Sequence, residues 1–425
     1  MAPRISPLAP FTDAELARMR RDTPAWGRHA HFAHGSASLP PEPVYAEWQA
    51  WMEAERMLGA QRAAERHVDA LHEARDSVAR LVNAQPHQVA FLCSASQAWA
   101  AAMSAALSGD RKAHVVTTHD EYGANALYLL TAAQRRRLHF SVVSARPGPV
   151  PLLQRLDEAL SRIDTGCLPV VSLTAVPTAW GVVTPVHDVA RRVHERGGLL
   201  FLDASHAVGQ LPVDMQAVGC DVLVFPARKW LRGPKGVGVL CLSDRALDML
   251  GQPDTVDVAG AQWLAGDRVR PWPDARRFEG HGFHPGLRLS LGAACEYAMA
   301  VDPARIACRN MQVRQRVADA LYEHFGWQSL EAGHPGATAM LTYALPRTAG
   351  DGDAFVRSLW DTGVNASFVG TQYARWALDA AGLPGVLRLT PHYLTDDDEI
   401  ARLAHAIRQL IQTTDRRRPA ALPMT

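Results

Sequence analysis

The chain has 425 residues, enough for one large domain and a smaller one. Its 44 Lys and Arg residues balance 43 Asp and Glu residues, which leaves a formal net charge of +1. This balance gives no support for a nucleic-acid partner or an acidic lipid surface.

The six cysteines are scattered along the chain, without a Cys-x-x-Cys pair or a metal-ligand spacing. Most lie in apolar stretches, so we expect reduced, buried thiols in a cytoplasmic protein and no metal site. Residues 1–22 lack the long apolar segment of a signal peptide, and no window approaches about 18 consecutive apolar residues. We therefore expect neither secretion nor a membrane span.

The first part of the chain divides into an irregular segment and a helical one. Residues 1–40 are rich in proline, apart from a short amphipathic piece at residues 13–21. From Glu42 to Val82 apolar residues recur at helical spacing, which predicts long helices with a break at Gly59.

Seven short apolar runs follow, separated by segments with helical periodicity. The predicted strands are residues 88–93, 114–118, 139–144, 168–174, 198–203, 222–226 and 236–242. The predicted helices between them are residues 96–107, 123–137, 151–163 and 186–197. Strands rich in Val and Leu that alternate with helices predict an α/β fold, with a mainly parallel seven-stranded sheet and helices on both faces.

After Ala300 the pattern changes. A long helix at 303–325, an alternating segment at 338–345 and a closing helix at 396–413 predict a smaller α+β domain. We expect three parts: an N-terminal arm (1–42), a large domain (43–298) and a small C-terminal domain (299–425).

Two charged residues follow predicted strands. Asp203 ends the run at 198–203, and Lys229 follows the run at 222–226 with Arg228 beside it. Ligands of parallel sheets bind beyond the carboxyl ends of the strands, so both residues are candidates for a site. A lysine can form a Schiff base if burial and nearby cations favour its neutral amine, and an aspartate can hold a protonated ring nitrogen. These two residues alone do not exclude the alternative that Asp203 only caps a helix and Lys229 is an ordinary surface lysine.

The stretch from 199 to 242 resembles the class V family of pyridoxal-phosphate enzymes, which includes aminotransferases, cysteine desulfurases and selenocysteine lyases. Its Asp-x-x-His motif after one strand, and its lysine ahead of a Gly-Pro-x-Gly turn, match that family. The resemblance implies fold type I, pyridoxal 5′-phosphate as the cofactor, and Lys229 as the lysine that bonds to it. Asp203 would pair with the ring nitrogen, and His206 would lie near the ring oxygen or the phosphate.

Other segments extend the resemblance over most of the chain. The implied cofactor contacts are the phosphate cup at Ala95, Ser96 and Gln97, the ring-stacking Tyr122, the ring-oxygen contact Thr178, and Arg228. The resemblance also implies that the N-terminal arm (1–42) lies over the active site. The implied substrate contacts are Arg388 for the carboxylate, Gly35 and Ser36 on that arm, Asn125, and His392 with Tyr393. The subgroup that these segments resemble includes the selenocysteine-lyase-like proteins and the carbon–sulfur lyases of ergothioneine synthesis.

Two departures from the family pattern bear on the reaction. Desulfurases of the family carry a nucleophilic cysteine ahead of the carboxylate arginine, whereas residues 363–389 contain none. Gly280-His281 stands where many relatives have Gly-Thr, so His281 or His284 would replace the threonine that reaches the partner subunit's phosphate.

We therefore expect a carbon–sulfur β-lyase that cleaves an S-substituted cysteine or its sulfoxide, releasing a sulfur product, pyruvate and ammonia. An aminotransferase or an amino-acid epimerase of the same family is the alternative. A non-enzymatic regulator would be expected to have lost Lys229, Asp203 or Arg388, and all three are present. The family also implies a homodimer with its active site at the interface and a small amino acid as substrate, whose identity the sequence does not reveal.

Overall fold

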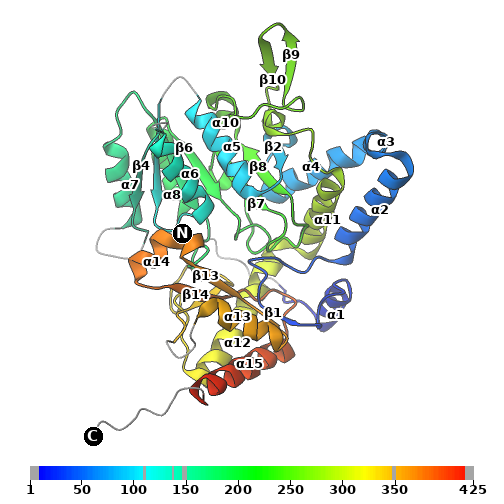
Figure 1. The fold of residues 1–425 in the computed structure, drawn as a ribbon, viewed down its shortest axis with the longest axis vertical. Helices are drawn as coiled ribbons and strands as arrows, with labels where there is room; N and C mark the ends of the chain where they lie inside the picture. The colour runs from blue at the N-terminus through cyan, green and yellow to red at the C-terminus, as the bar shows by residue number, and fades with distance from the viewer. Residues whose placement is uncertain (1–8, 109–111, 136–137, 146–150, 347–350, 417–425) are drawn as a thin grey trace.

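The computed structural model describes residues 9–108, 112–135, 138–145, 151–346 and 351–416. At its centre is a seven-stranded sheet (Figure 1). In spatial order the strands are β2 (Val89–Leu92), β8 (Gly238–Leu242), β7 (Val222–Pro226), β6 (Leu199–Asp203), β5 (Leu168–Thr174), β3 (Ala113–Thr118) and β4 (His139–Val143). The seven predicted strands and the α/β fold are thus confirmed.

One strand runs against the others. β8 pairs antiparallel with both β2 and β7, whereas β7, β6, β5, β3 and β4 are parallel. The connection from β7 to β8 contains no helix, and a parallel pairing would need a longer crossover. The turn that reverses the chain here is the segment that contains Lys229.

Both faces of the sheet are buried because apolar side chains point alternately to each side. In β6, Leu200 and Leu202 join the core on one face, and Leu199 and Phe201 join the core on the other. The helices that contribute to the first core include α4 (Val68–Val82), α7 (Leu152–Ser161), α8 (Val186–Glu195), α9 (Met215–Val218) and α11 (Pro285–Val301). Those of the second core include α5 (Ala95–Leu107), α6 (Gly123–Gln134) and α10 (Asp244–Met249).

The N-terminal region packs against distant parts of the chain. It comprises α1 (Asp13–Arg21), β1 (Ala30–His31), α2 (Glu42–Leu58), α3 (Ala60–Arg66), α4 and the 3₁₀ turn η1 (Pro86–Gln88). The predicted helical stretch breaks at Gly59, as expected, and again at His67. β1 pairs in parallel with β12 (Val364–Asn365), which joins the N-terminal segment to the C-terminal region.

The C-terminal region forms a second layer of structure, below the sheet in Figure 1. Its elements are α12 (Pro303–Phe325), β11 (Leu341–Tyr343), α13 (Gly352–Asp361), β12, β13 (Ser367–Gly370), α14 (Thr371–Ala381), β14 (Gly385–Leu389) and α15 (Asp397–Arg416). β11, β14 and β13 form an antiparallel sheet. The predicted helices at 303–325 and 396–413 are confirmed, while the predicted domain boundaries stay predictions.

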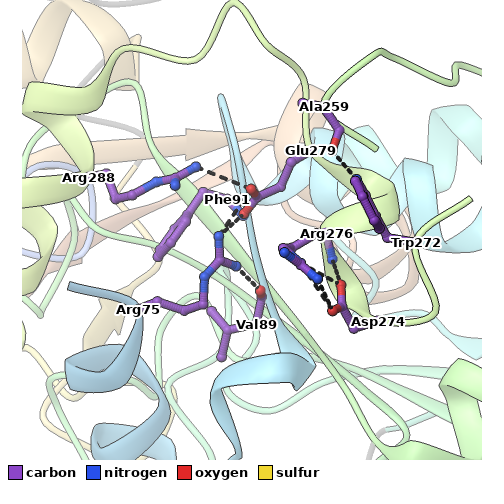
Figure 2. Close-up of polar contacts among 9 residues, drawn as sticks. All are labelled: Arg75, Val89, Phe91, Ala259, Trp272, Asp274, Arg276, Glu279 and Arg288. Carbon is purple, nitrogen blue, oxygen red and sulfur yellow. Dashed lines mark hydrogen bonds and ion pairs between the residues drawn. The ribbon is translucent and has the colours of Figure 1, made fainter. Parts of the chain in front are cut away.

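A hairpin and an anchored loop connect α10 to α11. The hairpin of β9 (Ala261–Ala265) and β10 (Arg268–Pro271) projects from the body of the protein (Figure 1). After the 3₁₀ turn η2 (Ala275–Phe278), Glu279 accepts a hydrogen bond from the Phe91 backbone at 2.9 Å and forms ion pairs with Arg75 and Arg288 (Figure 2). This network fixes the loop against α4, β2 and α11. Among the described residues, no helix combines the length and the apolar character needed to cross a bilayer.

Candidate active site

The carboxyl ends of β6 and β7 bring the two predicted key residues together. The strands are adjacent and parallel, with Asp203 opposite Val224. Asp203 is the last residue of β6, and Lys229 lies in the turn that follows β7. Lys229 Nζ is 3.1 Å from Nε2 of His206 and 5.8 Å from the centre of the Tyr122 ring.

A cavity of about 220 Å³ opens at this edge, and we call it the cofactor cavity. The predicted residues that line it are Ala95, Ser96, Tyr122, Asp203, Arg228 and Lys229. Three further residues of its wall that carry a hydroxyl or an amine, Ser94, Ser205 and Lys235, were not predicted as site residues. Lys235 belongs to the Gly-Pro-Lys-Gly turn shortly after Lys229. Its closeness to Lys229 in the sequence was the signal that could have identified it.

One end of the cofactor cavity is the start of α5. Ser94 is the N-cap of that helix, and its hydroxyl accepts a hydrogen bond from the Gln97 backbone at 3.1 Å. Helix N-termini attract anions through their free N–H groups and the helix dipole. Gln97, predicted as a third cup residue, does not line this cavity; it lines a neighbouring hollow that shares Cys93 with it.

Asp203 is held from behind by buried polar groups. Its Oδ1 accepts a hydrogen bond from the Ser205 backbone at 2.9 Å, and its Oδ2 accepts one from Asn125 Nδ2 at 3.4 Å. Asn125 also donates to Glu121 Oε1 at 2.9 Å. Asn125 therefore lies behind Asp203 and lines neither cavity, although the sequence suggested a substrate contact. Glu121 was not predicted; burial raises the pKa of its carboxyl, and nearby Asp203 adds to that effect.

The environment of Lys229 favours its neutral amine. Its pKa is lowered to about 7, mainly by burial and to a lesser extent by repulsion from Arg228 and Arg388, while the nearby Asp203 opposes this shift. Burial, with these same cations, also holds the pKa of His206 well below its ordinary value. A lysine amine that loses its proton near neutral pH can act as a nucleophile and as a base.

A second cavity of about 220 Å³, here the substrate cavity, shares Tyr122, Arg228 and Lys229 with the first. The predicted residues Gly35, Ser36, Thr178 and Arg388 also line it, together with Ser367 and Tyr373, which were not predicted.

Arg388 extends from β14 and is fixed by two hydroxyl groups. Its Nη1 donates to Thr178 Oγ1 at 2.5 Å, and its Nη2 donates to Ser36 Oγ at 2.7 Å. Burial lowers its pKa to about 10, which leaves it charged near neutral pH. A fixed, buried guanidinium of this kind suits a carboxylate ligand.

The C-terminal region covers the substrate cavity. A Cβ at Gly123 would lie 2.3 Å from the backbone oxygen of Gln372, so the start of α14 packs directly on the start of α6. This close approach brings Tyr373 to the cavity that Tyr122 lines.

Two predicted substrate contacts lie elsewhere. His392 is buried, donates from Nε2 to the Trp230 carbonyl at 3.1 Å and stacks on His34, with ring centres 4.7 Å apart. The Tyr393 hydroxyl accepts a hydrogen bond from Arg232. Neither residue lines the substrate cavity, and a contribution of either one to substrate binding stays a prediction.

His281 and His284 lie on the loop before α11. The His281 backbone donates to Asp257 Oδ1 at 2.8 Å, and the His284 ring centre is 6.4 Å from that of Trp51. Neither lines the two cavities of this chain. Their contribution to a partner subunit stays a prediction.

A scan of family models matches residues 32–403 to aminotransferase class-V. The chain belongs to this family. Pyridoxal 5′-phosphate is therefore its cofactor. Among curated class-V relatives, a probable cysteine desulfurase of Methanothermobacter thermautotrophicus is 27% identical over 307 residues, or 70% of this chain and 74% of the relative. The isopenicillin N epimerase of Streptomyces clavuligerus is 26% identical over 349 residues, or 79% and 83%.

Solved structures give the same fold. The cysteine desulfurase CsdA from Escherichia coli, in its S-sulfonic acid form, superposes with a TM-score of 0.82 at 19% identity, covering 95% of this chain and all of the other. The cystine C-S lyase C-DES in complex with cysteine persulfide superposes with a TM-score of 0.72 at 17% identity, covering 92% and 99%. These class-V folds confirm the predicted fold type I.

The donor set of the cofactor cavity fits pyridoxal phosphate. Asp203 is an acceptor for a ring N–H, and Lys229 is an amine that can reach an aldehyde. Lys235 and the N-terminus of α5, with the hydroxyl groups of Ser96 and Ser205, suit a phosphate. The residues that would hold each part of the cofactor are thus present in one cavity.

Proposed function

We propose that this class-V enzyme is a carbon–sulfur β-lyase acting on an S-substituted cysteine or its sulfoxide. The main support for this proposal is the composition of residues 363–389, the segment that covers the substrate cavity. It contributes Ser367, Phe368 and Tyr373 to the wall, and residues 363–389 contain no cysteine. A desulfurase needs a thiolate to accept sulfur from the substrate, and this segment offers none.

The cysteines elsewhere do not supply that acceptor. Cys93 is exposed, contrary to the expected burial, but it lies at the start of α5 and lines only the cofactor cavity and the neighbouring hollow. Cys220, Cys241 and Cys295 are buried, and burial raises the pKa of each thiol. Cys167 and Cys308 are half-buried and line neither cavity. In the proposed reaction sulfur therefore leaves with its own substituent rather than on the protein.

Each of the polar side chains in the two cavities would have a distinct role in such a reaction. Bound pyridoxal phosphate supplies an electron sink that acidifies the α-proton of an amino acid. Arg388 holds the substrate carboxylate, and Asp203 holds a proton at the ring nitrogen. Lys229, with its pKa near 7, takes the proton from Cα. The Cβ–S bond then breaks, sulfur leaves with the electron pair, and the released aminoacrylate takes up water to give pyruvate and ammonia.

An aminotransferase or an epimerase is the second candidate, favoured by the similarity to isopenicillin N epimerase. Both reactions also begin with loss of the α-proton, so the same lysine and arginine would serve them. They differ from the lyase in retaining the Cβ–S bond.

The test is incubation of the pure holoenzyme with an S-substituted cysteine and no keto acid. Release of pyruvate, lost in Lys229→Ala, supports the lyase. A requirement for a keto-acid acceptor supports transamination, and solvent deuterium at Cα of an intact, racemised substrate supports epimerisation. A protein persulfide formed from L-cysteine, detected by mass spectrometry, would support desulfuration and contradict the proposal.

A second part of the proposed function is assembly as a homodimer. A hollow of about 570 Å³ lies between the first turns of α5 and the loop at 253–283, and it shares Cys93 with the cofactor cavity. The hairpin nearby exposes Trp263, Leu264 and Val269. A second copy over this face would cover apolar side chains and close the cofactor cavity from that side. The cytoplasmic location expected from the sequence stays a prediction.

A further inference from the structure

Trp230 follows Lys229 in the sequence and directs its indole N–H at His206. The indole nitrogen Nε1 is 3.4 Å from His206 Nδ1, and both side chains are buried. An indole N–H can only donate, so the nitrogen that it meets has to accept. A neutral imidazole carries one hydrogen, and the hydrogen bond at one ring nitrogen decides which nitrogen carries it. The contact with Trp230 therefore favours a His206 whose hydrogen is on Nε2.

The position of Trp230 is itself fixed by two neighbours. A Cβ at Gly209 would collide with the backbone of Trp230, so the turn after His206 packs directly on the turn that contains Trp230. On the other side, His392 donates from Nε2 to the Trp230 carbonyl at 3.1 Å and stacks on the indole, with ring centres 5.7 Å apart. These contacts hold the indole N–H against the imidazole.

The second nitrogen of His206 faces Lys229, with Nε2 and Nζ 3.1 Å apart. An Nε2–H can donate to the lone pair of a neutral amine, whereas an ammonium group has no lone pair and can only donate. Arg388 Nη1 also approaches Nε2, at 3.4 Å. It does not need an acceptor there, because Thr178 offers one for each Nη1 hydrogen, the backbone oxygen at 3.2 Å and Oγ1 at 2.5 Å.

We propose that Trp230 is a positioning residue, whose indole N–H fixes His206 as the tautomer that donates from Nε2 to the free amine of Lys229. This hydrogen bond stabilises the neutral amine against the ammonium form, and so enlarges the fraction of Lys229 that is able to act as a nucleophile or a base near neutral pH. The inference goes beyond the proposed lyase, because an aminotransferase or an epimerase would need the same amine. A negative result in the pyruvate test leaves it unchanged.

The tautomer can be measured in the wild-type protein. Protonated and unprotonated ring nitrogens differ widely in ¹⁵N chemical shift, and the full-length apoprotein labelled at histidine gives both shifts for each ring. Because the chain has 18 histidines, the spectrum of His206→Gln is needed to identify the signals of His206. We expect the hydrogen on Nε2 near neutral pH. A hydrogen on Nδ1 would overturn the inference without any further variant.

Trp230→Phe removes the N–H and keeps an aromatic ring. We expect the His206 hydrogen to move to Nδ1, which turns Nε2 into an acceptor for a protonated Lys229. Reductive methylation with formaldehyde, which modifies only the neutral amine, should then level off at a pH about 1–2 units higher, the effect of one hydrogen bond to a charged group. Either an unchanged tautomer or an unchanged pH profile in this variant would refute the proposal.

Trp51→Phe is the matched control. Trp51 is equally buried, but its indole N–H donates to Glu55 at 2.8 Å and it lines neither cavity. This variant should lower the urea midpoint, as the loss of a buried indole does, without moving the tautomer of His206 or the profile of Lys229.

A double variant separates the hydrogen bond from simple packing. In a His206→Gln background no imidazole is left to change its tautomer, so adding Trp230→Phe should leave the Lys229 profile where His206→Gln alone puts it. A further shift of about one pH unit or more in the double variant would show that Trp230 acts on Lys229 through packing, and the inference would be wrong.

Discussion

Lys229 Nζ and His206 Nε2 lie 3.1 Å apart, and Arg388 Nη1 approaches the same imidazole nitrogen at 3.4 Å. An imidazole that faces two basic groups can only be neutral there, which agrees with a His206 pKa well below its ordinary value. Lys229 in turn is surrounded by cations and largely removed from water. At this site burial and the two arginines, Arg228 and Arg388, favour an uncharged Lys229, and Asp203 opposes them.

The depressed pKa of Lys229 is directly testable because the chain has only three lysines, Lys112, Lys229 and Lys235. Reductive methylation with formaldehyde requires the neutral amine. In the apoprotein, the methylation rate of Lys229 should rise with pH up to about 7 and then level off, because its folded pKa is about 7. Peptide mass spectrometry across pH 5–10 would follow each lysine.

A free lysine derivative with a blocked α-amine, added to the same reaction, is the reference, since an ordinary lysine amine gains reactivity up to about pH 10. Parallel profiles for this reference and Lys229 would contradict the lowered pKa.

Glu121 supports Asp203 through Asn125, which gives a prediction about stability. Its carboxylate accepts hydrogen bonds from Thr117, Ser172, Asn125 and the Tyr122 backbone, at 2.7–3.0 Å. Glu121→Ala leaves these buried donors unsatisfied and should cost about 2–5 kcal/mol of stability. Glu121→Gln should cost less, about 1 kcal/mol, because the two hydroxyls can rotate to accept from its amide. Urea unfolding of both variants would check this, and equal losses would show that the hydrogen bonds do not matter.

The sheet could be predicted from the sequence because its strands are buried on both faces. β5 occupies the predicted range 168–174, where five of the seven residues are apolar or proline and all are buried. The direction of β8 could not be predicted, because an apolar run reads alike in either direction. The missing crossover helix between 226 and 238 was the only available signal.

The key residues of the candidate site could be predicted because motif and strand end coincide at Asp203 and Lys229. The orientation of nearby polar side chains could not. Asn125 and His392 lie one layer behind the cavities, since the sequence does not tell which side of a turn faces the ligand. Ser367 and Tyr373 were missed because they reach the site through contacts of the C-terminal region with α6, far away in sequence.

The proposed dimer predicts a role for the projecting hairpin. Trp263 on β9 is 79% exposed, and exposed tryptophans at interfaces often contribute more than 2 kcal/mol, or a factor above about 10 in the dissociation constant. We expect light scattering to give the mass of two chains for the wild type, and Trp263→Ser to raise the dimer dissociation constant at least about 10-fold. Tyr322→Ser is the control, because Tyr322 is 64% exposed on α12, away from the hairpin. A fully active monomeric wild type would exclude the dimer.

The ion pairs in Figure 2 predict which carboxylate holds the loop before α11. Glu279 is buried between Arg75 and Arg288, at 3.0 and 3.3 Å, and both guanidinium groups lie over the Phe91 ring. Glu279→Gln leaves two poorly solvated cations without a counter-charge, so we expect a loss of about 3–5 kcal/mol and a lower urea midpoint. The surface pair of Arg80 and Glu296, with side chains 60% and 49% exposed, provides the control, and Glu296→Gln should cost less than about 1 kcal/mol. Similar urea midpoints for Glu279→Gln and Glu296→Gln would mean that the buried ion pairs of Glu279 stabilise the fold no more than the surface pair does.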